Sequence, residues 1–187
     1  MPVMDATPPT PAQDLGSLDL VVLAHENDAA VASIKKYELE FILNTQKISD
    51  LDGSENPLTW NSIGFGKQEI DKVPADKEGI YAFVISDPRT FLPPHGYIMY
   101  IGLSGRDSFR SLHDRYSDYF KQSELQRRPR IKRMIVQWHS LLRFHFAPVD
   151  LPRAELKALE KRLITAFLPP CCRGDIEAGT RKMMDAF

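Results

Sequence analysis

The chain has 187 residues, of which 43% are hydrophobic and 26% charged, a composition typical of one globular domain with an accessory region. No apolar run approaches the length of a membrane-spanning helix, and the N-terminus lacks the basic start and apolar stretch of a secretory signal. These features argue against a membrane partner and predict a cytoplasmic protein. Cys171 and Cys172 are adjacent, so we expect free thiols rather than a disulfide, which fits a reducing compartment.

The formal net charge of −1 hides an uneven distribution. Residues 1–100 contain 7 Lys and Arg against 15 Asp and Glu, whereas residues 101–187 contain 17 against 10. A polyanion would therefore be attracted to the C-terminal half and repelled by much of the N-terminal half.

The first 72 residues carry weak structural signals. Residues 1–17 are rich in Pro, Ala and Asp and are expected to form a disordered tail. Residues 18–72 are expected to be an N-terminal accessory region, with one or two helices before residue 48 and a polar loop over 50–77. Its run Gly64-Phe65-Gly66-Lys67 lacks P-loop spacing and follows no strong apolar strand, so a plain loop is favoured over a phosphate loop.

Residues 73–187 are expected to form the main domain, of class α/β (α+β). Apolar, β-favouring runs predict strands over 80–85 and 97–102, joined by a loop over 87–96, and clean alternation predicts a third strand over 142–146. Periodicity predicts a helix over 108–120, and a basic stretch over 126–138 also has helical character. The last predicted helix begins after Asp150 as N-cap and ends at residue 167, before two prolines.

The last helix carries a carboxylate on its apolar face. At the helical period, Leu156, Leu159, Leu163 and Phe167 form the buried stripe, and Glu160 falls inside it. A carboxylate facing the core costs several kcal/mol unless a cation compensates its charge. Periodicity alone favours a buried ion pair or a carboxylate that reaches solvent at the edge, and a bound divalent cation is the alternative.

Gly79-Ile80-Tyr81 and Tyr100-Ile101-Gly102 stand on the two consecutive predicted strands. With the arginine-bearing helix, third strand and glutamate-bearing helix that follow, about residues 73–172 resemble the GIY-YIG nuclease family, including the bacterial excision-repair incision nuclease. This resemblance implies a small three-stranded antiparallel sheet flanked by helices.

The resemblance also implies roles for individual residues. Glu160 would bind one divalent metal, Mg²⁺ or Mn²⁺. Tyr81 and Tyr100 would be the signature tyrosines, with Tyr81 as the general base or its relay. Arg115, preferred over Arg110 because Tyr119 follows it by four residues, would clamp the scissile phosphate. Tyr119 would then be a further site residue, and ordinary amphipathic packing is the alternative reading of that position.

The chain departs from the family pattern at three places. The signature tyrosines are 19 positions apart, more than is usual, which marks residues 87–96 as an insertion. Leu103 stands where the family often has lysine, and Cys172 stands where it usually has an asparagine that helps to organise the site.

A cluster of cations follows the arginine-bearing helix, and phosphate contacts of this kind supply affinity without sequence information. Its members are Arg127, Arg128, Arg130, Lys132 and Arg133. The alternative reading is a solvated helix face. We expect DNA as the partner, with RNA and a homodimer both left open.

The sequence therefore predicts a metal-dependent endonuclease that hydrolyses phosphodiester bonds in DNA with a tyrosine-assisted water nucleophile. The alternative is a catalytically degenerate domain that binds nucleic acid or a protein without cutting. Cys172 and Leu103 favour the alternative. The alternative is disfavoured because the chain retains all four of Tyr81, Tyr100, Arg115 and Glu160. A pure binding domain needs no carboxylate on the apolar face of a helix.

Overall fold

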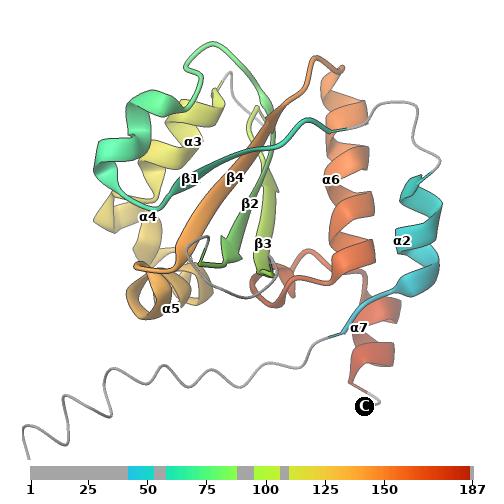
Figure 1. The fold of residues 1–187 in the computed structure, drawn as a ribbon. Helices are drawn as coiled ribbons and strands as arrows, with labels where there is room; N and C mark the ends of the chain where they lie inside the picture. Colours follow the sequence, from blue (N-terminus) through green and yellow to red (C-terminus); the bar gives the residue numbers. More distant parts are fainter. Residues whose placement is uncertain (1–41, 53–57, 88–94, 106–109, 186–187) are drawn as a thin grey trace, which may run out of the picture. The chain divides into compact units, whose positions relative to one another are not determined.

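The computed structural model describes residues 42–52, 58–87, 95–105 and 110–185 (Figure 1). The expected tail over 1–17, most of the expected helices before residue 48, and most of the expected insertion over 87–96 lie outside these ranges. Among the helices described, none has the length and apolar character needed to cross a membrane.

The centre of the domain is an antiparallel sheet in the order β1-β4-β2-β3. Its strands are β1 (Asn61–Gly64), β2 (Gly79–Ile85), β3 (Tyr97–Leu103) and β4 (Leu142–Pro148). The mixed helix-and-strand class and the antiparallel pairing are confirmed, but the sheet has four strands where three were expected. The additional strand, β1, lies within the segment expected to be a loop, and it pairs with β4 from Asn61↔Phe146 to Gly64↔Arg143. Because β1 is short and only partly buried, its side-chain pattern does not predict a strand. Main-chain hydrogen bonds with β4 join it to the sheet.

The register between β2 and β3 decides which residues share a face. Tyr81 pairs with Gly102 and Phe83 with Tyr100, so both signature tyrosines project from the same side of the sheet. A β-bulge follows, because Val84 pairs with Ile98 and leaves Met99 as an extra residue.

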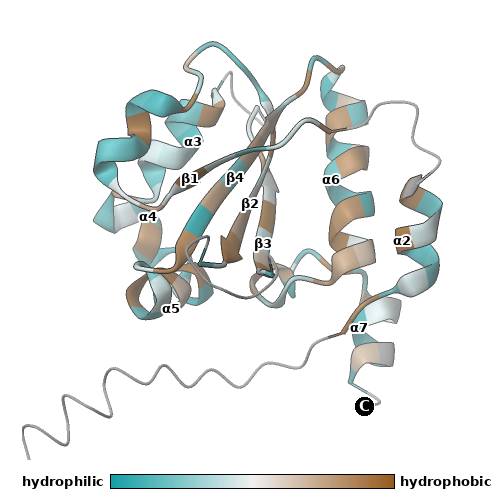
Figure 2. Cartoon of the chain, in the orientation of Figure 1, coloured by the Kyte–Doolittle hydropathy of each residue, from teal (hydrophilic) through white to brown (hydrophobic). Residues whose placement is uncertain are grey.

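One face of the sheet is covered by α6 (Arg153–Phe167), with α2 (Thr45–Asp52) packed against α6, and by the 3-10 helix η2 (Pro170–Cys172). The helix α7 (Ala178–Met184) follows η2 in the chain. In Figure 2, α6 alternates hydrophobic and hydrophilic bands, as expected of a helix with one buried face. The core on this side is formed by Ile80, Ala82, Ile101, Leu103, Leu156, Leu163, Ile164, Leu168, Cys172 and Ile176.

The start of α6 differs from expectation. Asp150 is not its N-cap; Pro152 takes that position, and its carbonyl accepts hydrogen bonds from the main-chain N–H groups of Glu155 and Leu156. The helix ends at Phe167, as predicted, and its C-cap Leu168 adopts a left-handed conformation with φ of 44°. Two prolines follow, as expected, and the turn leads the chain into η2 beneath β3.

Three helices lie on the side of the sheet away from α6, namely α3 (Leu112–Asp118), α4 (Gln122–Gln126) and α5 (Pro129–Trp138) (Figure 1). The helix expected over 108–120 is shorter, because Ser111 and Asp114 form a capping box that begins it at Leu112. The basic stretch expected as one helix over 126–138 contains the end of α4 and all of α5, with Pro129 as the first residue of α5.

An aromatic layer fills the space between these helices and the sheet. Tyr81, Phe83 and Phe144 from the strands lie with ring centroids 5.4–6.4 Å apart, and Tyr116 of α3 lies 4.4 Å from Phe144. The Tyr116 hydroxyl accepts a hydrogen bond from the Gly66 N–H at 2.9 Å. The run Gly64-Phe65-Gly66-Lys67, expected to be a plain loop, instead joins the end of β1 to the start of the 3-10 helix η1 (Lys67–Lys72), and Gly66 anchors it to α3.

Candidate active site

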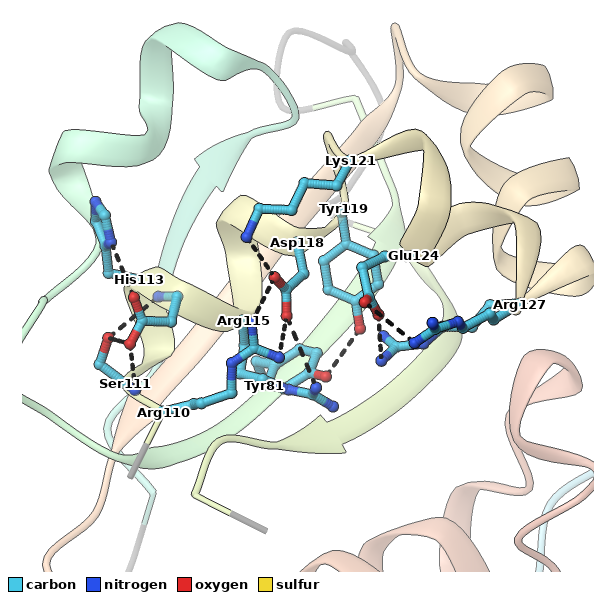
Figure 3. A network of polar contacts seen from close by, with 12 residues as sticks. Tyr81, Arg110, Ser111, His113, Arg115, Asp118, Tyr119, Lys121, Glu124 and Arg127 are labelled. Carbon is cyan, nitrogen blue, oxygen red and sulfur yellow. Dashed lines mark hydrogen bonds and ion pairs between the residues drawn. The ribbon is translucent and has the colours of Figure 1, made fainter. Parts of the chain in front are cut away.

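Tyr81 lies on the central strand β2, and its hydroxyl is 2.8 Å from that of Tyr119, the residue that ends α3 (Figure 3). Both side chains are buried. The short distance defines a hydrogen bond in which either oxygen can be the donor. Tyr119 is therefore buried, as ordinary amphipathic packing would require, and it also makes a specific hydrogen bond with the signature tyrosine Tyr81.

Gly102 leaves room for this pair. It faces Tyr81 across the β2–β3 ladder, and a Cβ atom added there would overlap both the Tyr81 hydroxyl and the Tyr100 ring. Tyr81 and Tyr100 have ring centroids 6.1 Å apart. The Tyr81 ring therefore reaches across β3, the strand at the edge of the sheet.

Arg115 projects from the last turn of α3 into this group of phenols, and its side chain is 17% exposed. Tyr81, then Tyr119 and Tyr100, hold the pKa of Arg115 above its ordinary value in spite of burial, so the guanidinium stays charged. Its Nε is buried and makes no hydrogen bond with any residue in the described ranges. Three phenols thus lie beside one partly buried cation.

The protonation states of two of these phenols follow from burial. Burial raises the pKa of both Tyr100 and Tyr119 well above the ordinary value, and the neighbouring Tyr81 raises it further. At neutral pH both groups therefore keep their protons and are poor bases.

Asp118 is a polar residue of this region that sequence reasoning missed. Its side chain is 1% exposed, and its Oδ1 accepts hydrogen bonds from Arg110 Nη2 at 2.8 Å and Lys121 Nζ at 3.0 Å. Arg115 Nη1 lies 4.0 Å from Oδ2. Asp118 is three residues from both Arg115 and Lys121, the spacing of ion pairs on a helix, and this was the available signal.

Glu160 is buried on α6, with 9% of its surface exposed, as helical periodicity predicted. It lies on the other face of the sheet from Tyr81, because α6 covers the face that carries Ile80 and Ala82. Within the described ranges no group of three or more His, Cys, Asp and Glu residues could hold a metal ion. Any metal bound by Glu160 would thus take few ligands from these side chains.

Cys172 packs against the edge strand β3 in the core on the α6 side of the sheet. Its Sγ accepts a hydrogen bond from the Ile101 N–H at 3.3 Å and donates one to the Ile101 carbonyl at 3.2 Å. Burial raises the pKa of the Cys172 thiol, and the charge of Glu160 raises it further. The thiol in turn raises the pKa of Tyr100. Burial likewise raises the pKa of Cys171 to about 11, so both cysteines are protonated free thiols, as expected.

The five expected DNA-binding cations lie in and around α4 and α5. Arg127 and Arg128 each have a guanidinium nitrogen 3.6 Å from the Glu124 carboxylate. The Arg128 guanidinium also lies over the Tyr119 ring, 5.6 Å from its centroid, which places this cation beside the tyrosine pair. Arg130, Lys132 and Arg133 are exposed on α5.

Comparison with protein-family models, curated proteins and solved structures finds no match to this chain. The family resemblance therefore rests on the motif residues and on where they lie. The fold brings Tyr81, Tyr100, Arg115 and Tyr119 together, whereas Glu160 lies on the other face of the sheet.

Proposed function

We propose that this chain is a metal-dependent endonuclease of the GIY-YIG type that hydrolyses phosphodiester bonds in DNA. The observation that carries the proposal is the hydroxyl pair of Tyr81 and Tyr119, 2.8 Å apart, beside the charged Arg115. Burying phenols and a guanidinium in one cluster costs free energy that an apolar core would avoid. Such local conflicts with stability are expected at functional sites.

Each member of the cluster has a role suited to its environment. Arg115 would bind the scissile phosphate and stabilise the charge that develops on it during attack by water. Tyr81 would help to remove the proton of that water or relay it. Tyr119 keeps its own proton because burial raises its pKa, so it would orient the Tyr81 hydroxyl by donating a hydrogen bond.

Glu160 is the residue that would hold the metal. The donor set fits Mg²⁺ or Mn²⁺, because such hard cations bind proteins through one or two carboxylates and take their remaining ligands from water and substrate phosphate. When bound, the ion would supply charge stabilisation to a phosphate that reaches Glu160, which lies on the opposite face of the sheet from Arg115.

The exposed cations of α5 and the Arg127–Arg128 pair would supply affinity for the DNA backbone. Arg128 is central to this role, because its guanidinium lies over the Tyr119 ring. A DNA phosphate bound by Arg128 would therefore lie close to the proposed reaction centre. Contacts of this kind carry no sequence information, so they fit any duplex or branched substrate.

The second candidate function is binding of nucleic acid or a protein without cleavage. The complete burial of Tyr81 favours it, because its hydroxyl is bonded to Tyr119 rather than open to water. Cleavage would require this pair to open when substrate enters, whereas a binding module has no such requirement.

A cleavage assay on supercoiled and branched DNA with Mg²⁺, Mn²⁺ or EDTA tests the proposal. We expect metal-dependent nicking by the wild type that is lost in Glu160→Gln and Tyr81→Phe. The matched control is Glu155→Gln, which changes an exposed carboxylate on the same helix and should cut normally. DNA binding without cleavage on every substrate would favour the second candidate, and cutting that survives Glu160→Gln would refute the assigned metal ligand.

A further inference from the structure

Asp118 is almost fully buried and gathers cations from three places in the chain. Arg110 precedes α3 and approaches with both terminal nitrogens, each 2.8 Å from a different carboxylate oxygen. Lys121, which precedes α4, hydrogen-bonds to the same Oδ1 as Arg110, so the two head groups lie side by side. Figure 3 shows these two side chains approaching Asp118 from different directions, with Arg115 next to it.

The cations around Asp118 outnumber the single carboxylate that they contact, whereas a structural ion pair has one cation for each carboxylate. The Asp118 carboxylate is opposed by the three cations Arg110, Arg115 and Lys121. Asp114 also interacts with the charge of Arg110, and the group of five side chains keeps a net positive charge. Arg110 is 38% exposed and Lys121 is 56% exposed, so the excess charge is displayed to solvent. Their contacts with Asp118 use only some of the N–H donors that a guanidinium and an ammonium carry.

The buried carboxylate restrains these flexible side chains before any ligand arrives. Exposed arginine and lysine side chains lose conformational freedom when they bind, and a site that is already ordered avoids part of that cost. Arg110 and Arg115 both approach Oδ2 of Asp118, at 2.8 and 4.0 Å, so the displayed cations adjoin the arginine of the candidate active site.

We propose that Arg110 and Lys121, held by Asp118, form a second phosphate site that takes the nucleic-acid phosphodiester next to the one bound at Arg115. This assignment rests on the proposed function, because it takes Arg115 as the group that binds the first phosphate. The two neighbouring phosphates would meet the net positive charge of this cluster. The site would set the path of the strand across α3 and fix which phosphate reaches Tyr81.

Fluorescence anisotropy with a labelled DNA duplex over a series of salt concentrations tests the site. Each lost phosphate contact lowers the slope of log K against log salt by about 0.9, which corresponds to about an eightfold loss of affinity near 0.1 M salt. We expect this change for Lys121→Ala and for Arg110→Ala. The matched control is Arg162→Ala, which removes an exposed cation from α6, on the other face of the sheet, and should leave the slope unchanged.

Asp118→Asn separates positioning from simple charge. Removing the carboxylate leaves both cations in place but no longer held. The salt slope should therefore be kept or increased, while the cleavage rate at saturating DNA falls. A purely structural role would instead lower the melting temperature and the affinity together, and would overturn the proposal.

The assays distinguish failure of this site from failure of the nuclease proposal. If the wild type cuts DNA while Lys121→Ala and Arg110→Ala retain the wild-type salt slope, the second phosphate site is refuted and the nuclease proposal stands. If the wild type does not cut but both variants lose slope and Arg162→Ala does not, the phosphate site is supported and only the nuclease proposal fails.

Discussion

Gly102→Ala is the substitution whose effect on the candidate site can be worked out most directly. A Cβ atom at this position would lie 2.6 Å from the hydroxyl oxygen and 2.7 Å from Cζ of Tyr81, and 2.9 Å from Cε1 of Tyr100. Gly102 does not adopt a left-handed backbone conformation, so alanine there meets no backbone strain. The entire effect should therefore come from overlap with the two rings.

The required displacement is large compared with the hydrogen bond at stake. Carbon atoms pack at about 3.5–4.0 Å, so the Tyr81 ring has to move by roughly 1 Å. Phe144, whose ring centroid is 5.4 Å away, and Tyr119 limit that movement. Overpacking of this kind costs about 1–3 kcal/mol. A shift of this size would also break the 2.8 Å contact between the hydroxyls of Tyr81 and Tyr119.

Two measurements on the purified Gly102→Ala variant test this reasoning. The melting temperature should fall by about 2–4 °C for each kcal/mol lost. The cleavage rate at saturating DNA should fall by about 100-fold, since a displacement of about 1 Å in a catalytic group has effects of that order. Gly174→Ala is the matched control, because a Cβ atom there meets nothing within 4 Å. Wild-type cleavage and melting temperature in Gly102→Ala would refute the role assigned to this close approach.

Three further predictions concern groups around the site. Cys172→Ala should lower the free energy of unfolding by about 1–3 kcal/mol in urea titrations, because it leaves two main-chain groups of β3 unpaired. Cys172→Asn should retain more stability, because its amide offers a donor and an acceptor. Equal losses of stability in both variants would contradict this reasoning. Tyr116→Phe should destabilise the chain by a similar amount in the same titration by removing the hydrogen bonds to the loop before η1, whereas Tyr97→Phe, at an exposed position, should have no effect. Burial raises the pKa of Tyr100 and Tyr119 above 10.0, so the unfolded chain loses these protons before the folded chain does. The free energy of unfolding should therefore fall as the pH rises above 10.0. A constant free energy of unfolding in that range would contradict the assigned burial.

The sequence by itself determined those features whose signal lies within one element. The apolar runs around Tyr81 and Tyr100 and the alternation around Phe144 predicted three strands, because side-chain periodicity reports directly on burial. The burial of Glu160 followed from the helical period in the same way. The adjacent cysteines were confirmed as free thiols, because chain geometry alone disfavours a bridge between neighbours. The roles in catalysis stay predictions.

Only the tertiary structure decided how separate elements meet. β1 joins the sheet through main-chain hydrogen bonds, which the identity of its side chains does not reveal. The Ser111 capping box begins α3 at Leu112, so Arg110 lies outside the helix. Arg110 and Arg115 therefore both approach Asp118, whereas a single longer helix would have pointed the two arginines apart. The contact of Tyr81 with Tyr119 joins positions 38 residues apart. Such contacts depend on the register of β2 with β3 and on the packing of α3 over the sheet, and neither is encoded in local periodicity.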